Sequence, residues 1–313
     1  MFTRILFNRL EKYLENNNII CPEQIEFKRG ARTSYHIFIL KSLIDKCFKN
    51  NKYVFACFVD LKKALDTVNR QALLFKLNRY NIRGHFLNII EDMYNDVSFS
   101  IRLANGITQP FQTSIGVKQR CVLTPTNFSV YMNDLVEHFN LECDPVSING
   151  KSISCLLYAD DIVLMSQSPN GLQKLLDNLK LFCDKWNLKV NIQKTKVMIF
   201  NKSGKVLKGY NFSFEEQSLE LVSEYKYLGI IFKPSGSFSF AKNYLSKKAS
   251  KAMFCIRKTL YSEKLNAFLH LRLFDARVKP ILLYCSEIWS LDILIKRNLN
   301  FESKYDSFVP NKT

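Results

Sequence analysis

Two short apolar runs with a pair of carboxylates between them stand out at residues 156–165, which read LLYADDIVLM. Apolar runs of this length bounded by polar residues are typical of core strands, so the sequence predicts two strands joined by a tight connection. Asp160 and Asp161 would lie at or beside that connection. An Asp at a turn is also an ordinary residue facing water, so this stretch by itself leaves a structural and a functional interpretation open.

The composition indicates a folded protein with a polyanionic partner. With 313 residues, 47% of them hydrophobic, the chain can form one large domain plus a smaller one, or two domains. It carries 45 Lys and Arg against 28 Asp and Glu, a net charge of +17 that is spread along the whole chain. Nucleic acid is the favoured partner, and an anionic membrane or a merely basic surface are the alternatives.

No apolar run approaches the roughly 20 residues that a membrane span requires, and the N-terminal segment has an amphipathic helix pattern without a secretory signal. We therefore expect an intracellular protein, in the nucleus, the cytoplasm or both, with no membrane partner. The nine Cys form no CxxC pair, and most of them, such as Cys57 and Cys155, fall inside apolar runs. Buried free thiols are predicted, and neither a disulfide framework nor a zinc site is supported.

Helical and strand patterns alternate through the first part of the chain. Helices are predicted at residues 2–16, 35–48, 86–94, 124–139 and 168–186, strands at 53–60, 197–200 and 227–232, and a hairpin around Ala104-Asn105-Gly106. Thr124 is expected to be an N-cap with Pro125 as the first helical residue. After the PSGS stretch at 234–237 only helices are predicted, so we expect a mixed domain with helices on a sheet, followed by a smaller helical unit.

A third carboxylate, Asp60, ends the predicted strand at 53–60 and is its only charge. If this strand lies beside the 156–165 pair, then Asp60, Asp160 and Asp161 share one rim of the sheet, where they would repel one another unless divalent cations neutralise them. Mg²⁺ prefers a few carboxylate oxygens plus substrate phosphates, and two ions roughly 3.5–4 Å apart support in-line phosphoryl transfer. Such a site suits a polymerase, a nuclease or another metal-dependent phosphotransferase.

Six segments in order make the chain resemble the reverse transcriptases of non-LTR (LINE-type) retrotransposons, from Phe2 to about Trp289. The segments are FKRGARTSYHIFIL (fingers), FVDLKKALDTVNR (first catalytic motif), IGVKQRCVLTPTNFSVYMNDL (template and nucleotide), LLYADDIVLM (two catalytic Asp), NIQKTKVMIF (Lys-bearing motif) and YKYLGIIF (primer-grip strand). YADD alone is moderately specific, whereas six such segments in the family's order are strong evidence.

The resemblance implies an α+β right-hand polymerase. Fingers and an antiparallel-sheet palm would occupy residues 1–233, and a smaller helical, thumb-like region would occupy 234–313. The implied activity is RNA-directed DNA polymerisation, with an RNA template, a DNA primer and dNTPs as partners and no obligate protein partner evident. Basic residues of the helical region would face the phosphates of the primer–template duplex, namely Lys242, Lys247, Lys248, Lys251, Arg257 and Lys258.

The resemblance also implies roles for the acidic residues and their neighbours. Asp60, Asp160 and Asp161 would hold two Mg²⁺, or Mn²⁺ in their place, with the backbone carbonyl of Leu61 as a further ligand. The primer 3′-hydroxyl would attack the α-phosphate of the incoming nucleotide. Lys194 is expected to act as an acid toward the departing pyrophosphate, with Lys196 as the alternative.

The nucleotide and template would meet a second set of residues. Lys28 and Arg32 match the family's basic fingers positions that hold the triphosphate, and their alternative is a solvated surface charge. Gln119 would contact nucleotide or template. Leu65 sits where the family usually carries a Phe that crowds the sugar 2′ position, which would weaken the exclusion of ribonucleotides.

Several family positions are altered. Arg120 replaces the Gly of the QG step, where the missing side chain lets backbone approach the nucleotide, so a long cation there should obstruct or reorient binding. Glu26, Tyr35 and Cys285 replace a Gly, an Asp and a Gly. Family members also commonly carry an upstream endonuclease and further downstream sequence. The alternative to a working polymerase is therefore a decayed or partial copy that binds nucleic acid without catalysis, and a metal nuclease is the third interpretation.

Overall fold

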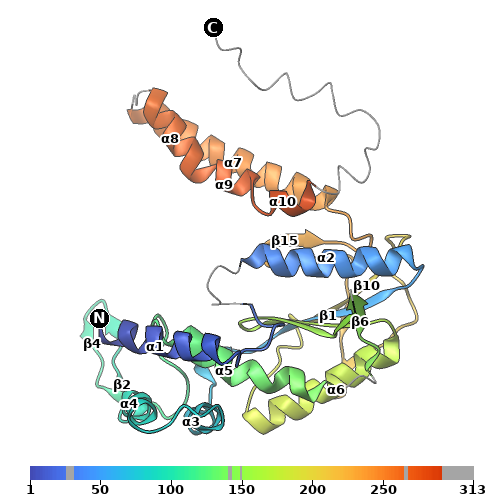
Figure 1. Cartoon of the computed structure of the whole chain (residues 1–313). Coiled ribbons are helices and arrows are strands. Elements are labelled where there is room, and N and C mark those ends of the chain that lie inside the picture. The colour runs from blue at the N-terminus through green and yellow to red at the C-terminus, as the bar shows by residue number, and fades with distance from the viewer. Residues whose placement is uncertain (26–31, 140–142, 149, 264–266, 291–313) are drawn as a thin grey trace.

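A five-stranded sheet with helices on both faces forms the centre of the protein, and further helices lie beyond one of these faces (Figure 1). The computed structural model describes residues 1–25, 32–139, 143–148, 150–263 and 267–290. The strand order is β13-β10-β1-β9-β8, antiparallel except for the β10–β13 pair. The strands are β1 (Val54–Asp60), β8 (Cys155–Tyr158), β9 (Asp161–Ser166), β10 (Lys196–Phe200) and β13 (Glu220–Leu221).

The central strand β1 is buried along its length except at Asp60, its last residue. It lies between β10 and β9, and both of its faces are covered, which explains why its sequence is apolar throughout instead of alternating. Phe55, Cys57 and Val59 join one core cluster, whereas Ala56 and Phe58 join the other. The predicted strand at 53–60 and the predicted strand pair at 156–165 are both confirmed.

The two faces are covered by different elements (Figure 1). On one side pack α1 (Phe2–Asn16), α3 (Arg70–Arg79), α5 (Thr124–Met132) and α6 (Pro169–Trp186). On the other side pack α2 (Thr33–Lys49), the hairpin of β14 (Tyr225–Tyr227) and β15 (Ile230–Phe232), and the start of α7 (Ser239–Glu263). By strand alternation, the side chains of Asp60 and Asp161 project from the sheet on this second side.

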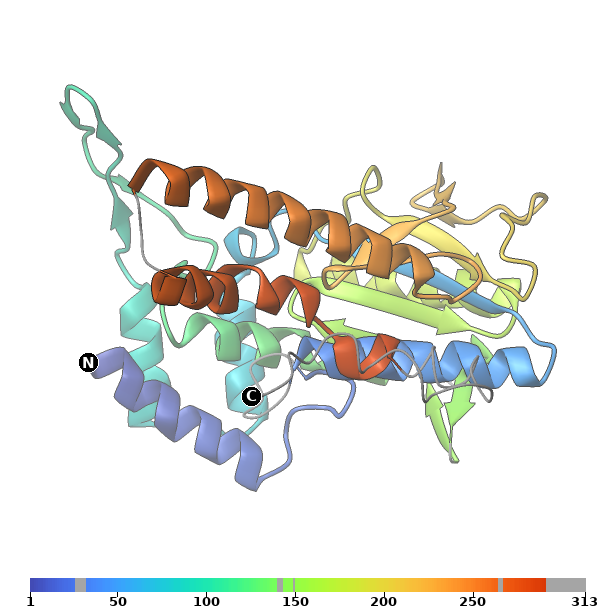
Figure 2. The same ribbon diagram turned by 90° about the horizontal axis from the view of Figure 1, so that it is seen from above.

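Short elements complete the described residues. Their helices are η1 (Ala64–Asp66), α4 (His85–Tyr94), η2 (Asn133–His138), α8 (Ala267–Arg277), α9 (Lys279–Leu282) and α10 (Ser286–Trp289). Their strands form the pairs β2 (Ser98–Phe99) with β5 (Phe111–Gln112), β3 (Arg102–Leu103) with β4 (Gly106–Ile107), β6 (Val146–Ile148) with β7 (Lys151–Ile153), and β11 (Ser213–Phe214) with β12 (Gln217–Ser218). Figure 2 shows the predicted hairpin around residues 104–106 projecting from the body of the molecule.

The predicted helices are present, with two differences. The helix predicted over 124–139 is α-helical only to Met132 and continues as the tighter η2. Thr124 is the first residue of α5 and not its N-cap, because its hydroxyl donates to the carbonyl of Lys118 at 2.6 Å and so fastens the preceding loop. None of the described helices has the length and apolar character needed to cross a bilayer. The nine Cys all lie in the described residues and none of them forms a disulfide, and Cys57 and Cys155 are buried as predicted.

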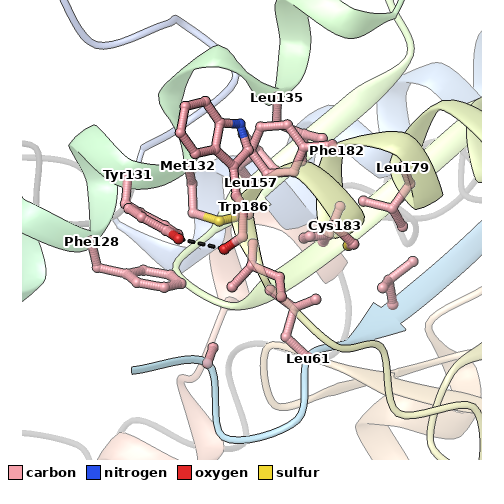
Figure 3. Packing of buried hydrophobic residues seen from close by; sticks show 14 of the residues in the cluster. Leu61, Phe128, Tyr131, Met132, Leu135, Leu157, Leu179, Phe182, Cys183 and Trp186 are labelled. Atoms are coloured by element: carbon pink, nitrogen blue, oxygen red, sulfur yellow. Dashed lines mark hydrogen bonds between the residues drawn. The ribbon is translucent and has the colours of Figure 1, made fainter. Parts of the chain in front are cut away.

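The helix α6 illustrates how sequence determines position here. Ser168 caps it by accepting a hydrogen bond from Gly171 N at 3.0 Å, and its apolar stripe is buried. At its end, Trp186 packs against the side chains of Phe182 and Tyr131, and the Tyr131 hydroxyl donates to the Trp186 carbonyl at 2.5 Å (Figure 3).

A buried lysine of α3 contacts three other helices on this side, α5, η2 and α6. Lys76 of α3 lies with its Nζ 2.5 Å from Asp134 Oδ1 and donates to the Tyr131 carbonyl. The same Nζ lies 3.8 Å from the centroid of the Trp186 ring, a cation–π contact. Burial lowers the pKa of Lys76 to about 8, while Asp134 opposes that shift. The pair fixes α3 against η2 and α6.

Gly171 provides a test of the packing between α6 and the sheet. A Cβ at this buried position would overlap Ser166 Oγ and the carbonyl of Cys143. We therefore expect Gly171→Ala to lower the free energy of unfolding by about 1–3 kcal/mol, since overpacking outweighs the gain in helix propensity. Urea denaturation measures this change in the free energy of unfolding. Asn170→Ala, a substitution at the exposed neighbouring residue, is the control and should be near neutral. A stabilised Gly171→Ala variant would contradict the close approach.

Candidate active site

The three carboxylates predicted to converge do lie at one rim of the sheet. In the β1–β9 register Asp60 is directly opposite Asp161, and side chains of such antiparallel partners project from the same face, with Cβ atoms about 4.5–5.5 Å apart. Tyr158 pairs with Asp161 across the β8–β9 hairpin, which leaves Ala159 and Asp160 as its two-residue turn. Ala159 has a φ of 51°, the left-handed conformation that a two-residue hairpin favours. Asp160 is therefore presented by the turn and Asp161 by the first residue of β9.

Electrostatic repulsion is visible at this rim. The pKa of Asp161 is raised from 3.8 to about 6, first because surrounding protein displaces water from its carboxyl and then because of the charges of Asp160 and Asp60. Asp160 and Asp161 nevertheless keep solvent contact, and Asp60 is half-buried. The group is thus accessible to a ligand and unfavourable in the absence of a counter-charge.

A lysine and a tyrosine flank the carboxylates. Lys194 Nζ lies 3.8 Å from Asp60 Oδ2 and is otherwise exposed. Lys196, the alternative candidate, is turned away into a 2.5 Å pair with Glu220 Oε2, so Lys194 is the lysine of the rim. Tyr225 of β14 stacks on Phe58 at 4.3 Å between ring centroids, and burial, followed by the charges of Asp161 and Asp60, raises its pKa to about 12. Neither helical nor strand periodicity points to Tyr225 as a neighbour of the carboxylates.

Backbone pairing holds the segment that follows Asp60. Asn191 N donates to the Asp60 carbonyl at 2.7 Å, and Lys62 N donates to the Lys189 carbonyl at 2.7 Å. Leu61 lies between these two bonds with a buried side chain, and its own carbonyl takes part in neither. The Thr195 hydroxyl accepts from Asp60 N at 3.2 Å. The loop that carries Lys194 is therefore fixed to the end of β1.

The candidates Leu65, Gln119 and Arg120 also come together. Val117 N donates to the Leu65 carbonyl at 2.9 Å, and Gln119 Nε2 donates to Asp66 Oδ1 at 2.7 Å. Leu65 is half-buried, whereas Gln119 and Arg120 are exposed. Arg120 has a φ of 62°, in the left-handed region where a Cβ costs about 1–2 kcal/mol and a Gly costs little. The backbone here keeps the conformation of a glycine although the residue is an arginine.

The fingers candidates are placed only in part. Arg32 directly precedes α2, and its side chain is exposed. Lys28, together with the altered position Glu26, lies outside the described residues. The altered Tyr35 is exposed on the first turn of α2, and Cys285 is buried between α9 and α10 with a φ of 54°, again a glycine-like conformation.

The donor set at the rim suits a hard divalent cation, because it consists of carboxylates whose repulsion a cation would relieve. In the described part of the chain, no three His, Cys, Asp or Glu side chains already form a metal cage. Magnesium usually takes one or two carboxylates together with substrate phosphates, so an incomplete protein cage is compatible with it.

Comparisons with known proteins agree with this arrangement. Residues 1–232 match the family described as "Reverse transcriptase (RNA-dependent DNA polymerase)". A Drosophila melanogaster protein named "Probable RNA-directed DNA polymerase from transposon BS" is 27% identical over 96% of this chain and 33% of its own length. The RNA-directed DNA polymerase of the mobile element jockey, from the same species, is 25% identical over 75% of this chain and 26% of its own. The chain thus spans about a third or less of these relatives.

Solved structures give the same fold. Apo telomerase from Candida tropicalis matches with a TM-score of 0.54 at 12% identity, covering 96% of this chain and 60% of that one. A version truncated from its C-terminal domain matches with a TM-score of 0.50 at 14% identity, covering 69% of this chain and 43% of that one. At this identity the likeness concerns the fold alone, which is the predicted α+β right-hand polymerase fold.

The crowding of Asp161 predicts a pH-dependent effect on stability. Its folded pKa of about 6 lies above its ordinary 3.8, so the cost of ionising it is absent below about pH 4 and grows as pH rises through 6. Asn cannot ionise. In EDTA we therefore expect the free energy of unfolding of Asp161→Asn, relative to that of the parent protein, to rise by about 1 kcal/mol from pH 4 to pH 7.5. The value is small because solvent partly screens the exposed carboxyl. Urea denaturation at both pH values measures this.

The control for this prediction is Asp184→Asn, at an exposed carboxylate of α6 that pairs with Lys180 at 3.6 Å. It should change little with pH. A difference between Asp161→Asn and the parent that stays constant from pH 4 to 7.5 would show that Asp161 titrates normally.

Proposed function

Because this chain belongs to the reverse transcriptase family, we propose that it is an RNA-directed DNA polymerase of the non-LTR retrotransposon type, transferring nucleotides from dNTPs to a primer 3′-hydroxyl. One observation carries the proposal: Asp60 faces Asp161 across two paired strands while Asp160 occupies the adjoining turn. Nucleotidyl transfer needs positioning and charge neutralisation more than covalent help, and a solvent-accessible rim of carboxylates suits that requirement.

In this proposal Asp60, Asp160 and Asp161 hold two Mg²⁺, or Mn²⁺ in their place, and the Leu61 carbonyl, unused by the flanking backbone bonds, is a further ligand. When bound, the ions would supply neutralisation of the phosphates and activation of the primer hydroxyl. Lys194, whose Nζ lies 3.8 Å from Asp60 Oδ2, would deliver a proton to the departing pyrophosphate. Its high exposure lets its ammonium follow a substrate.

The remaining candidates are proposed to contact the nucleotide and the duplex. Leu65 borders the sugar and Gln119 the nucleotide or template, while Arg32, with Lys28, holds the triphosphate. Along α7, the side chains of Lys247, Lys248, Lys251, Arg257 and Lys258 are exposed and available to duplex phosphates, whereas Lys242 is half-buried with its Nζ 5.7 Å from the Trp289 ring. RNA template, DNA primer and dNTPs are the proposed partners, at a site of action in the nucleus, the cytoplasm or both.

The domain division belongs to the same proposal. Residues 1–233 would act as fingers and palm, and 234–313 as a thumb-like region. The observation that supports it is the change at Ser239, after which the described residues are helical. The first helix of that region still shares a core with the palm, because Ala241 and Leu245 pack in the cluster that contains α2 and β15.

One specific observation favours the second candidate function, a catalytically silent nucleic-acid-binding remnant. The exposed Arg120 occupies a left-handed backbone position next to Gln119, where a glycine would leave the approach to the nucleotide open. The basic surface would persist in such a remnant while nucleotide entry would not.

Primer extension tests the first candidate. With an RNA template, a DNA primer, dNTPs and a magnesium titration, we expect template-directed extension that requires the cation and falls at least 100-fold in Asp160→Asn, since the negative charge and one of the two carboxylate oxygens are lost together. Asp184→Asn is the matched control at an exposed carboxylate and should keep full activity. Extension that survives Asp160→Asn, or that proceeds in EDTA, would overturn the assignment.

Arg120→Gly separates the two candidate functions. We expect it to raise the free energy of unfolding by up to about 1 kcal/mol, because relief of the left-handed strain exceeds the entropy cost of glycine, and to lower the KM for dNTP. Arg120→Ala keeps the Cβ and should gain no stability, although it also removes the guanidinium. If extension and nucleotide affinity are the same in all three proteins, obstruction by Arg120 is the wrong explanation.

A further inference from the structure

Tyr284, a half-buried residue between α9 and α10, connects three parts of the chain that are far apart in sequence. Its hydroxyl donates to the carbonyl of Leu228 at 2.7 Å and lies 3.2 Å from the hydroxyl of Thr33. A phenol has one proton to donate, so with Leu228 as acceptor the Thr33 hydroxyl must be the donor of the second bond. The Tyr284 hydroxyl therefore sits between the tip of one hairpin and the first residue of α2.

The hairpin tip is built to receive this ring. Tyr227 pairs with Ile230, which leaves Leu228 and Gly229 as the two-residue turn of β14–β15. Both have positive φ, 43° and 83°. A Cβ on Gly229 would lie 3.0 Å from Cε1 of the Tyr284 ring, so glycine is needed for the ring to sit on the turn. Leu228 is in the left-handed region despite its side chain, and the bond from Tyr284 to its carbonyl stabilises that conformation.

A second polar link joins the same two elements one helical turn further along α2. His36 Nδ1 lies 3.3 Å from the Tyr227 hydroxyl, and His36 Nε2 lies 3.1 Å from the Glu23 carbonyl. Burial lowers the pKa of His36 to about 4, so the ring is neutral and carries one proton. The carbonyl can only accept, so Nε2 donates to it and Nδ1 accepts from Tyr227. Positions 33 and 36 thus hold one face of α2 to the hairpin.

The far end of the hairpin reaches the carboxylates. Tyr225, three residues before the turn, stacks on Phe58 of β1 beside Asp60 and Asp161. A shift of the turn would therefore be transmitted along β14 to the catalytic rim. We call the two hydrogen bonds of the Tyr284 hydroxyl, to Leu228 and Thr33, the joint. Thr33, at its other end, is the neighbour of Arg32.

We propose that Tyr284 is a positioning residue, whose hydroxyl locks the Leu228–Gly229 turn to the start of α2 and so aligns the β14–β15 hairpin with the catalytic carboxylates. The inference rests on the proposed polymerase function and deepens it. In that function the hairpin would contact the primer terminus, as its resemblance to the primer-grip strand implies, and the first turn of α2 adjoins Arg32, which would hold the triphosphate. The joint thus sets the distance between the two reacting partners, to which transfer is sensitive.

Tyr284→Phe is the informative variant, because it keeps the ring on Gly229 and removes only the hydroxyl. In single-nucleotide addition normalised to active sites, we expect kcat to fall about 5- to 20-fold while the Kd for primer–template stays unchanged and the Tm falls by only a few degrees, as the loss of one hydrogen bond requires. Tyr244→Phe is the matched control, a half-buried tyrosine on α7 whose hydroxyl makes no hydrogen bond among the described residues. Trp289→Phe removes the bond from Nε1 to the Tyr284 carbonyl, 2.9 Å, and leaves the hydroxyl joint in place.

Thr33→Val separates the two hydrogen bonds of the joint. Valine keeps the shape of threonine but has no hydroxyl, so only the bond from Thr33 to Tyr284 is lost. It should reduce kcat by less than Tyr284→Phe does, and adding it to Tyr284→Phe should cost nothing further. A fully additive double variant would mean that Thr33 and Tyr284 act separately, which overturns the joint.

Amide hydrogen exchange gives a readout that does not depend on activity. Tyr284→Phe should raise exchange about tenfold at residues 226–230 and 33–37, and leave α6 unchanged. Unaltered exchange in both segments overturns the joint, and altered exchange with an unaltered kcat overturns its positioning role. If the parent protein extends no primer but the exchange responds as expected, the joint stands and the polymerase proposal is the part that fails.

Discussion

The pairing of β1 with β9 is the constraint on which the rest of the structure depends. It sets Asp60 opposite Asp161 while burying apolar side chains on both faces of the same two strands. Side chains of a strand alternate between faces and both faces are packed here, so a slip of one residue would send the apolar side chains of β9 into the wrong core cluster and turn Asp161 away from Asp60. Core packing therefore fixes the register, and the register fixes the rim where the carboxylates lie. Burial and charge repulsion raise the pKa of Asp161, and this cost is tolerated because burial of the apolar core beside it stabilises the fold by much more.

Much of this arrangement could be read from the sequence, and the reason is that it depends on local periodicity. The apolar run ending at Asp60 and the run split by Asp160 and Asp161 each predict a strand with a charge at its end, and sheet geometry does the rest. The stripe of α6 and its Ser168 cap were predictable for the same reason. The wider assignment came from the order of six motifs, which periodicity alone does not provide.

What the sequence did not predict depends on contacts between distant segments. Tyr225 looks like any strand aromatic, and only the stacking on Phe58 brings it to the carboxylates. Arg70 reads as a solvated helix charge, yet its guanidinium is buried and bonded to the carbonyls of Tyr94, Thr113, Ile115 and Gly116. Thr124 is a residue type that often caps a helix, but its hydroxyl donates to the Lys118 carbonyl in the preceding loop. In each case tertiary partners decide, and they are invisible to a pattern of spacing.

The buried pair of Lys76 and Asp134 restricts how this fold can vary. Removing Lys76 alone would leave the buried Asp134 with only its 3.8 Å pair to Arg79, and removing Asp134 alone would leave the Lys76 ammonium with only the Tyr131 carbonyl and the aromatic rings. Either loss costs about 3–5 kcal/mol, whereas two apolar residues of matching volume could replace the pair at little cost. Neither residue can therefore be replaced alone without this loss of stability. Descendants of this sequence should replace the two residues together or keep both. An ion pair far from the carboxylates thus restricts which substitutions the fold can accept as the sequence diverges.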